Sequence, residues 1–439
     1  MPKKRLDSWK EIAVYVGRDE RTALRWAKER GMPVHHVPGP GRGTVFAYTD
    51  QIDAWLNQQP AEETEARAAA GVEPPAAHPG KLWRIVLPVA AVLLVALLVV
   101  VGMRSPNSHR PGLPERIQLS RTKVQAVDAA GQQVWEYSLP EPVRFYSPAD
   151  QEGLENLARV VDLDGDGSPE VLVTARLEKM GEVSRSVLHC FTAEGELRWK
   201  YDPDVTLSFA GRPFGGPWNI ADVLAAPEGK GHAIWLAVAH YTWWPAFVVK
   251  LDAAGKAEVR FVNSGTLKIL NFVRTADTTY ILVGGFNNEQ DGGILAVLPA
   301  GKPAGTSPQK PGSPYRCDAC PPGEPVRYLV FPRSELNQTN PNMVNHVAAI
   351  GVTQKSIQVL TREGPEGVFA YYDFSLDPEP QLLSVTFSDP YWRWHKQLEE
   401  EGKIKHTQEQ CPERDGPRGV RVWEPGSGWR EMRPADKKR

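Results

Sequence analysis

The sequence predicts a multidomain chain. We expect a small α+β winged helix-turn-helix at residues 1–58, a flexible linker at 59–81, a single transmembrane helix at 82–104 and an all-β, propeller-like repeat domain at 105–439. Three observations predict this fold class. A capped amphipathic helix and a glycine turn stand near the N-terminus. A long apolar run follows them, and a strand–turn–strand pattern recurs along the rest of the chain.

The first predicted element is a helix that begins after Ser8. Ser8 and Glu11 form an S-x-x-E capping box, and apolar residues then repeat at helical spacing, at Trp9, Ile12, Ala13 and Val16. Gly17 ends this helix, and a second helix is expected over residues 20–30. "VHHV" and "TVFAY" predict a hairpin, and "TDQIDAWL" predicts a third helix. The order helix, helix, hairpin, helix is that of a small winged helix.

The second predicted helix carries three cations on one face. Arg21, Arg25 and Lys28 lie within about 60° of one another at 100° per residue. The chain as a whole is balanced, with 51 Lys+Arg and 53 Asp+Glu, so contact with a nucleic acid requires a local basic patch such as this one. On the helix alone, the same residues also fit a solvated basic face.

The stretches "WKEIAVYVG", "RTALRW", "GMPVHH", "FAY" and "IDAWL", within residues 6–57, resemble the excisionase and MerR-like family of winged helix-turn-helix domains. The resemblance implies binding of double-stranded DNA, with two copies on adjacent half-sites. The residues that it places at the major groove, the wing or the phosphates are Arg18, Arg21, Thr22, Arg25, Lys28 and Arg42.

The apolar run from Ile85 to Met103 contains no charged side chain. Its nineteen residues reach about 28 Å as a helix, close to the thickness of a hydrocarbon core. The run therefore predicts a single membrane span. The charges beside it do not fix its orientation, because cations flank both ends. A DNA-binding head would place the N-terminus in the cytoplasm, the span in the cytoplasmic membrane and the body outside it.

The body after this run repeats a strand, a tight turn and a strand. Turns are expected at Gly131, Gly195 and Gly255 and, less clearly, at Gly301, at intervals of 64, 60 and 46 residues. A tryptophan stands four residues after each of the first two turns. The pattern predicts blades of a β-propeller, and an array of sandwiches is the alternative architecture. The length would hold roughly seven blades of about 45 residues, whereas the spacing suits five or six.

The segment "VVDLDGDGSPEVLV" alternates three carboxylates before a glycine. It resembles the integrin-type FG-GAP (VCBS-like) propeller repeat, whose D-x-D-G-D-G loop binds calcium before a strand. The resemblance implies a structural calcium ion, held by Asp162, Asp164, Asp166, Ser168 through its carbonyl, and Glu170. A solvated acidic turn is the alternative interpretation.

Two further features remain open. Cys317 and Cys320 form "CDAC" without a histidine at zinc spacing, which predicts a disulfide between them or one with Cys411. The aromatic stretches "HYTWWPAF" and "DPYWRWHK" predict packing between blades or, alternatively, ligand platforms.

Together these features resemble bacterial transmembrane one-component transcription regulators. We expect a membrane-anchored regulator that couples an extracytoplasmic binding propeller to a cytoplasmic DNA-binding head, with an unidentified ligand or protein partner and dimerisation on DNA. The alternative is a membrane-anchored adhesion or scaffold propeller whose head binds another protein. The sequence shows no paired catalytic carboxylates, nucleophile elbow or metal–histidine cluster, so we expect no enzymatic activity.

Overall fold

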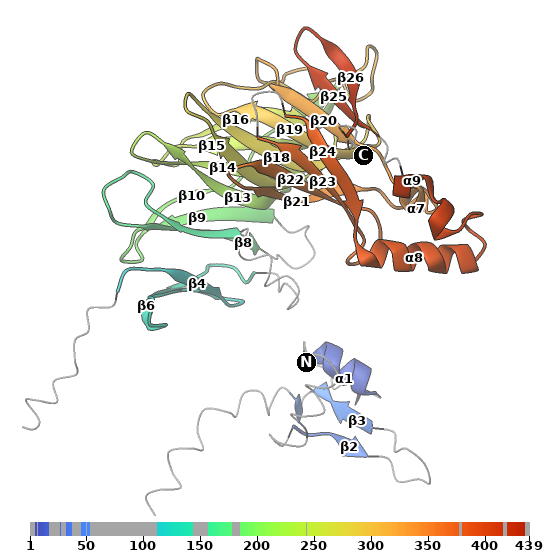
Figure 1. Ribbon diagram of the computed structural model, residues 1–439. Coiled ribbons are helices and arrows are strands. Elements are labelled where there is room, and N and C mark those ends of the chain that lie inside the picture. Colours follow the sequence, from blue (N-terminus) through green and yellow to red (C-terminus); the bar gives the residue numbers. More distant parts are fainter. Residues whose placement is uncertain are drawn as a thin grey trace, which may run out of the picture. The chain divides into compact units, whose positions relative to one another are not determined.

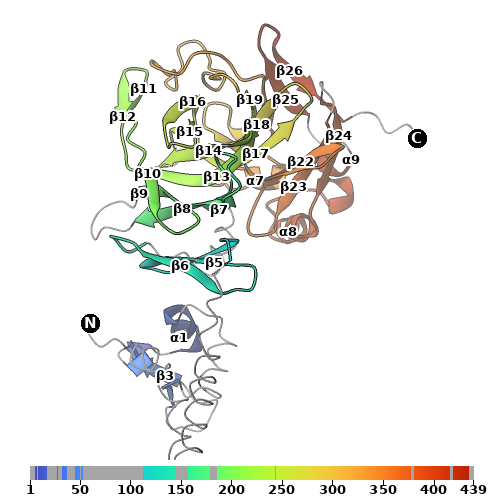
Figure 2. The same cartoon turned by 90° about the vertical axis from the view of Figure 1, so that its left-hand side faces the viewer.

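The computed structural model describes residues 5–6, 8–16, 27, 32–36, 45–49, 51–52, 112–143, 157–177, 185–242, 244–376, 380–415 and 419–434. The chain divides into two compact units. The first includes the N-terminal residues through His109, and the second includes nearly all residues from Arg110 to the C-terminus. Figure 1 and Figure 2 show the described helices and strands in two views. Each unit has a hydrophobic core of its own.

The first unit contains a short helix and a small sheet with the strand order β1–β3–β2. The bounds are β1 Arg5–Leu6, α1 Trp9–Tyr15, β2 His35–His36 and β3 Val45–Tyr48. Helix α1 begins as the capping box predicts, because Ser8 Oγ accepts a hydrogen bond from the Glu11 N–H at 3.1 Å. The core of the unit consists of Leu6, Ile12, Ala13, Met32, Val45, Ala47 and Ile52.

The predicted winged helix-turn-helix is corrected by this arrangement. Among the described residues of the unit, α1 is the one helix with defined bounds, and no helix-turn-helix is seen. The chain before α1 pairs with β3, with Arg5 opposite Tyr48, and β2 pairs with the other edge of β3. The expected two-stranded wing is therefore a three-stranded sheet. The predicted DNA contacts all lie outside the described residues: Arg18, Arg21, Thr22, Arg25, Lys28 and Arg42.

The predicted transmembrane helix is corrected as well. None of the helices in the described part of the chain combines the length and the apolar character needed to cross a membrane. The longest of them, α8 at Asp389–Glu400, has 12 residues and rises about 18 Å. The expected span at residues 82–104 lies outside the described residues. Single-pass anchoring and localisation to the cytoplasmic membrane are therefore not supported.

The second unit consists of antiparallel sheets whose strands follow one another along the chain. The first sheet contains β4 Arg116–Leu119, β5 Lys123–Val127 and β6 Gln133–Ser138. The second contains β7 Ala158–Val161, β8 Glu170–Leu177, β9 Arg185–Phe191 and β10 Leu197–Tyr201. The third contains β13 Trp218–Glu228, β14 Gly231–His240, β15 Ala246–Leu251 and β16 Ala257–Asn263.

The fourth sheet contains β17 Leu267–Arg274, β18 Thr279–Asn287, β19 Gly292–Pro299 and β20 Arg327–Phe331. The fifth contains β21 His346–Val352, β22 Ser356–Arg362, β23 Phe369–Ser375 and β24 Leu382–Phe387. A separate hairpin is formed by β11 Leu207–Phe209 and β12 Arg212–Phe214.

These five sheets pack against one another in chain order. A cluster of buried apolar side chains fills each space between successive sheets. Leu172 of the second sheet and Ile234 of the third, for example, belong to one such cluster. The first strands of neighbouring sheets also lie together, β7 with β13, β13 with β17 and β17 with β21. Burial of apolar side chains between the sheets therefore holds the stack together.

The predicted propeller is corrected as well: the described strands form separate antiparallel sheets, and no closed barrel is formed. Among the described residues, no apolar cluster joins the first sheet to the fifth, and the stack is open. Strands β25 Val420–Glu424 and β26 Gly428–Met432 pair onto β20 and extend the fourth sheet to six strands, so they add no further sheet to the stack.

A group of short helices lies at one side of the stack (Figure 1). It contains α7 Glu335–Gln338, α8, the 3-10 helix η1 Gln408–Gln410 and α9 Pro412–Asp415. Ser388 caps the start of α8, because its hydroxyl oxygen accepts a hydrogen bond from the Tyr391 N–H. The helices cover a small core of their own, formed by Leu336, Val368, Tyr391, Leu398 and Ile404.

Candidate functional sites

The predicted acidic loop connects β7 to β8. Asp162 Oδ1 accepts hydrogen bonds from the N–H groups of Gly165, at 2.7 Å, and Asp166, at 3.2 Å. Asp162 Oδ2 accepts one from the Gly167 N–H at 2.9 Å. Both glycines are left-handed, with φ of 78° and 91°, a conformation that glycine adopts without steric cost. These bonds hold the pKa of the Asp162 carboxyl below its usual value, and the Gly167 N–H is the largest cause.

Three carboxylates converge in this loop. One oxygen from each of Asp162, Asp164 and Asp166 lies within 4.8 Å of the other two. Asp166 Oδ1 also accepts a hydrogen bond from the Ser168 N–H at 2.7 Å, which orients this carboxylate over the turn. A set of oxygen ligands on a tight turn matches the chemistry of a hard divalent cation.

Arg198, on β10, connects two of the predicted ligands. Its guanidinium lies 2.8 Å from Asp164 Oδ2 and also contacts Glu170 Oε1. Glu170 is buried, and its second oxygen accepts a hydrogen bond from the Leu163 N–H at 2.9 Å. Burial raises the pKa of the Glu170 carboxyl. Arg198 therefore neutralises part of the negative charge that a bound cation would otherwise compensate.

The acidic loop is fixed to the β13–β14 hairpin of the next sheet. The His232 N–H donates a hydrogen bond to the Leu163 carbonyl at 3.0 Å, and His232 Nδ1 lies 2.8 Å from the Asp162 carbonyl. A Cβ on Gly231 would lie 2.1 Å from the Leu163 oxygen, so this approach requires glycine. The position of the loop is therefore coupled to the contact between the second and third sheets.

A disulfide joins Cys317 and Cys320 in the connection between β19 and β20. Cys317 pairs through its backbone with Phe209 of β11. Between the two cysteines, the Asp318 carboxylate accepts hydrogen bonds from the Ser208 hydroxyl at 2.8 Å and the Gly211 N–H at 2.7 Å. The disulfide segment thus anchors the β11–β12 hairpin. The other two cysteines, Cys190 and Cys411, are free and buried.

The aromatic stretches contribute mainly to packing. In the first, Phe247 is fully buried, and Trp244 packs against Phe214 with ring centroids 4.4 Å apart, whereas Tyr241 is 43% exposed. In the second, which forms most of α8, Tyr391 is fully buried and packs with Phe387. Most of these described rings are therefore not available as platforms for a ligand.

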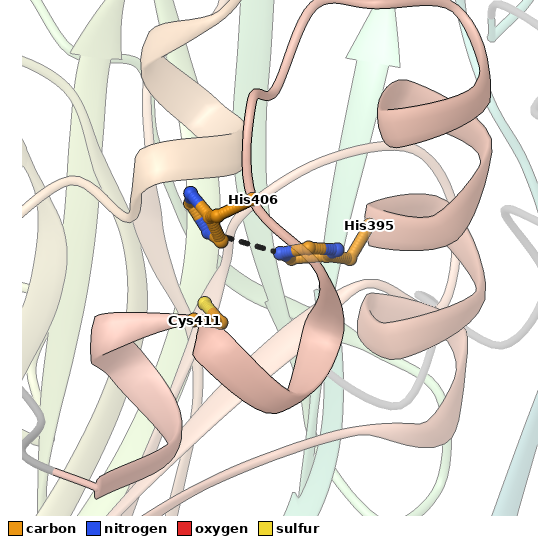
Figure 3. Close-up of side chains that lie close together, drawn as sticks. All are labelled: His395, His406 and Cys411. Atoms are coloured by element: carbon orange, nitrogen blue, oxygen red, sulfur yellow. Dashed lines mark hydrogen bonds between the residues drawn. The ribbon is translucent and has the colours of Figure 1, made fainter.

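The structure also brings together a group that the sequence does not predict. His395 on α8, His406 in the loop after α8 and Cys411 just before α9 point toward one another (Figure 3). Their ligand atoms all lie within 4.8 Å of one another. Ten residues separate the two histidines and four separate His406 from Cys411, so no short metal-binding motif is visible in the sequence. The signal in the sequence is that "DPYWRWHK" begins a helix, which places His395 on a helix that faces the following loop.

Comparison of the chain with known proteins finds no matching family model and no matching curated protein. The family resemblances therefore depend on the motifs alone. In the described part of the chain, the acidic loop and the histidine–cysteine group are the two sets of side chains whose metal-ligand atoms converge.

Proposed function

We propose that the second unit is a non-catalytic recognition module and that its acidic loop binds a structural calcium ion. The observation that carries this proposal is the convergence of the Asp162, Asp164 and Asp166 carboxylates on the β7–β8 turn. Calcium prefers six to eight oxygen ligands at about 2.3–2.6 Å, and a flexible turn accommodates such a shell. The Ser168 carbonyl supplies a further oxygen in the same loop. Glu170, at the start of β8, becomes a ligand only if it releases Arg198 or the Leu163 N–H.

The ion stabilises the junction between the second and third sheets. Three neighbouring carboxylates repel one another, and a divalent cation converts this repulsion into attraction. Because His232 of the β13–β14 hairpin is hydrogen-bonded to the loop, an ordered loop also holds this hairpin in place. Asp164 exchanges its ion pair with Arg198 for the metal when calcium binds.

The stacked sheets serve as a scaffold for their connecting loops. Loops on a rigid β-scaffold commonly carry binding functions, because the sheets fix their positions while the loop sequences vary. The proposal assigns partner binding to these loops and gives the calcium site a supporting structural role. DNA binding by the N-terminal unit and anchoring in a membrane are not part of it.

Calorimetric titration of the chelator-treated full chain with calcium tests the proposal. We expect one binding event at the acidic loop and a higher midpoint of thermal unfolding in saturating calcium. Asp166→Asn removes a charged ligand but keeps an oxygen that can accept the Ser168 N–H, and we expect it to abolish both effects. Asp252→Asn is the matched control, since Asp252 also caps a turn through the Ala254 and Lys256 N–H groups, at 3.0 and 2.9 Å.

Two results would contradict the calcium site. One is a thermal midpoint that does not respond to calcium. The other is equal loss of calcium binding in Asp166→Asn and Asp252→Asn. The recognition role predicts one further result. At limiting calcium, the Asp166→Asn chain should bind a partner more weakly than the Asp252→Asn chain does.

A further inference from the structure

The histidine–cysteine group joins the short segments of the helical region. His395 comes from the middle of α8, His406 from the loop that leaves it and Cys411 from the boundary between η1 and α9 (Figure 3). His395 and Cys411 are buried, with 0% and 1% of their surfaces exposed, and His406 is partly exposed. The group is therefore shielded from solvent on one side and open to ion entry on the other.

The distance between the two imidazoles matches a shared metal ligand sphere. His395 Nε2 and His406 Nε2 are 3.3 Å apart. Two nitrogens that bind one tetrahedral zinc ion at about 2.0–2.1 Å are separated by about 3.3–3.4 Å. The Cys411 sulfur lies within 4.8 Å of one ring nitrogen of each histidine, so it can serve as the third ligand of the set.

A hydrogen bond between the two histidines explains the group less well than a metal does. His406 Nε2 faces two acceptors, His395 Nε2 at 3.3 Å and Glu335 Oε2 at 3.5 Å, and a single imidazole proton cannot serve both in good geometry. If His395 instead donates its Nε2 proton, its Nδ1 becomes an acceptor, and this buried atom has no hydrogen-bond donor. A dication bound by the two Nε2 atoms and the Glu335 carboxylate needs no proton between them, which removes the conflict.

The surrounding carboxylates fit the remaining positions of such a site. Glu335, the first residue of α7, places an oxygen 3.5 Å from His406 Nε2, close to the separation expected of neighbouring ligands. Glu399 lies one helical turn after His395, with Oε2 4.0 Å from His395 Nδ1. An imidazole that binds metal through Nε2 carries its proton on Nδ1 and commonly donates it to a carboxylate. Glu399 is the carboxylate beside that proton, and its partly exposed side chain must move closer than 4.0 Å to accept it.

We propose that His395, His406 and Cys411, completed by Glu335, bind a structural zinc(II) ion. Imidazole and thiolate ligands favour zinc, whereas the all-oxygen acidic loop favours calcium. The zinc ion connects α7, α8 and the η1–α9 segment over the small core that contains Leu336, Tyr391 and Leu398. These helices are short, so a metal centre supplies stability that so small a core alone cannot.

Cobalt(II) titration of the chelator-treated full chain, with the Cys317–Cys320 disulfide left intact, tests the proposal. We expect one equivalent to bind with the visible spectrum of tetrahedral cobalt and a near-ultraviolet sulfur-to-cobalt charge-transfer band, and zinc to displace it. Cys411→Ser removes the charge-transfer band and weakens zinc binding. Cys190→Ala removes the other buried free thiol and leaves the spectrum unchanged.

Further variants separate the roles of the ligands. His406→Gln acts at a partly exposed position, so the chain remains folded, and zinc binding falls by more than the 10- to 100-fold typical of a lost outer partner. Glu399→Gln weakens zinc binding by about 10- to 100-fold but keeps the tetrahedral cobalt spectrum. Glu335→Gln weakens zinc binding and changes that spectrum, because a water replaces the carboxylate.

Several outcomes would overturn the zinc site. These are octahedral cobalt without a sulfur band, zinc affinity unchanged by both Cys411→Ser and His406→Gln, and equal effects of Cys411→Ser and Cys190→Ala. An unchanged spectrum in Glu335→Gln overturns the closure by Glu335. Asp166→Asn leaves zinc binding intact, so failure of the calcium proposal and failure of the zinc proposal are distinguishable.

Discussion

The indole of Trp135 lies directly on the backbone of Gly195, the turn glycine of the following sheet. Trp135 Nε1 donates a hydrogen bond to the Ala193 carbonyl at 3.1 Å, and a Cβ on Gly195 would lie 2.5 Å from the indole Cγ. The next repeat has the same contact. Trp199 donates to the Ala253 carbonyl at 3.0 Å, and its ring occupies the space beside Gly255. One sheet is thus fixed to the next by a tryptophan and a glycine turn.

This relationship predicts that Gly195→Ala strongly destabilises the chain. The new methyl group meets the Trp135 ring, and the left-handed φ of 90° is unfavourable for alanine. We expect the free energy of unfolding to fall by about 2–5 kcal/mol, the sum of the backbone and overpacking costs. Denaturant unfolding measures this loss.

Gly426→Ala is the control for the backbone cost alone. Gly426 has a similar φ of 76°, and an added Cβ meets no atom within 4 Å. We expect a loss of about 1–2 kcal/mol from its conformation. Equal losses in the two variants would show that the tryptophan contact contributes nothing.

The raised pKa of the buried Asp222 carboxyl predicts that the stability of the chain depends on pH. Burial raises the pKa of its carboxyl from the usual 3.8 to about 6, although the Leu270 N–H, at 2.6 Å, and Arg159 act in the opposite direction. The folded chain therefore holds this proton more tightly than the unfolded chain does. The stabilisation is complete below pH 3.8 and is lost as the pH rises through about 6. The loss is on the order of 3 kcal/mol.

Asp222→Asn isolates this contribution. Between about pH 4 and pH 6.5, the free energy of unfolding of the wild-type chain should fall relative to that of the variant. Denaturant curves of both chains at several pH values measure this difference in stability. Asp318→Asn is a control in which the pH dependence of stability should have the opposite sign. Hydrogen bonds, chiefly from the Gly211 N–H, lower the pKa of Asp318, so its contribution is lost as the pH falls through that lowered value. A flat difference for Asp222→Asn contradicts the assignment.

The hairpin turns are the part of the fold that sequence predicts best, because local chemistry determines them. Gly131, Gly195 and Gly255 are all left-handed, and each donates its N–H to a carbonyl three residues earlier. The weaker fourth candidate, Gly301, is not among the glycines with positive φ. The tryptophan also disappears after two repeats, since Val259 stands four residues after Gly255. The repeat is therefore strongest at the start of the stack.

Contacts between distant segments are the part that sequence does not provide. Strand β25 joins the fourth sheet through β20, for example Val422 opposite Leu329, and no periodicity in the sequence predicts that pairing. The histidine–cysteine group has the same origin, since it requires α8 to pack beside α7 and η1. In the first unit, β1 likewise pairs with β3, with Arg5 opposite Tyr48, although these strands lie far apart in the sequence.

The position of Arg198 predicts that its guanidinium competes with calcium for the same carboxylates. Its guanidinium pairs with Asp164 and Glu170, both expected calcium ligands. Arg198→Gln removes this competing charge, and we expect calcium to bind about two- to fivefold more tightly, the effect of a partly exposed ion pair. Without calcium the same variant is less stable, because the buried Glu170 loses its partner. Weaker calcium binding in Arg198→Gln would contradict the competition.

The disulfide predicts a modest dependence of stability on reducing agent. Cys317 and Cys320 are only three positions apart, so their bond constrains a short loop of the unfolded chain. We expect reduction to lower the free energy of unfolding by about 2 kcal/mol, measured by denaturant curves with and without reductant. Because Asp318 inside this loop anchors the β11–β12 hairpin, proteolysis near Gly211 should become faster at the same time. The double variant Cys317→Ser/Cys320→Ser should resemble the reduced chain and not respond to reductant. If mass spectrometry shows two newly released thiols while the wild-type curve stays unchanged, the bond does not stabilise the hairpin, and the Asp318 hydrogen bonds alone are sufficient to hold it.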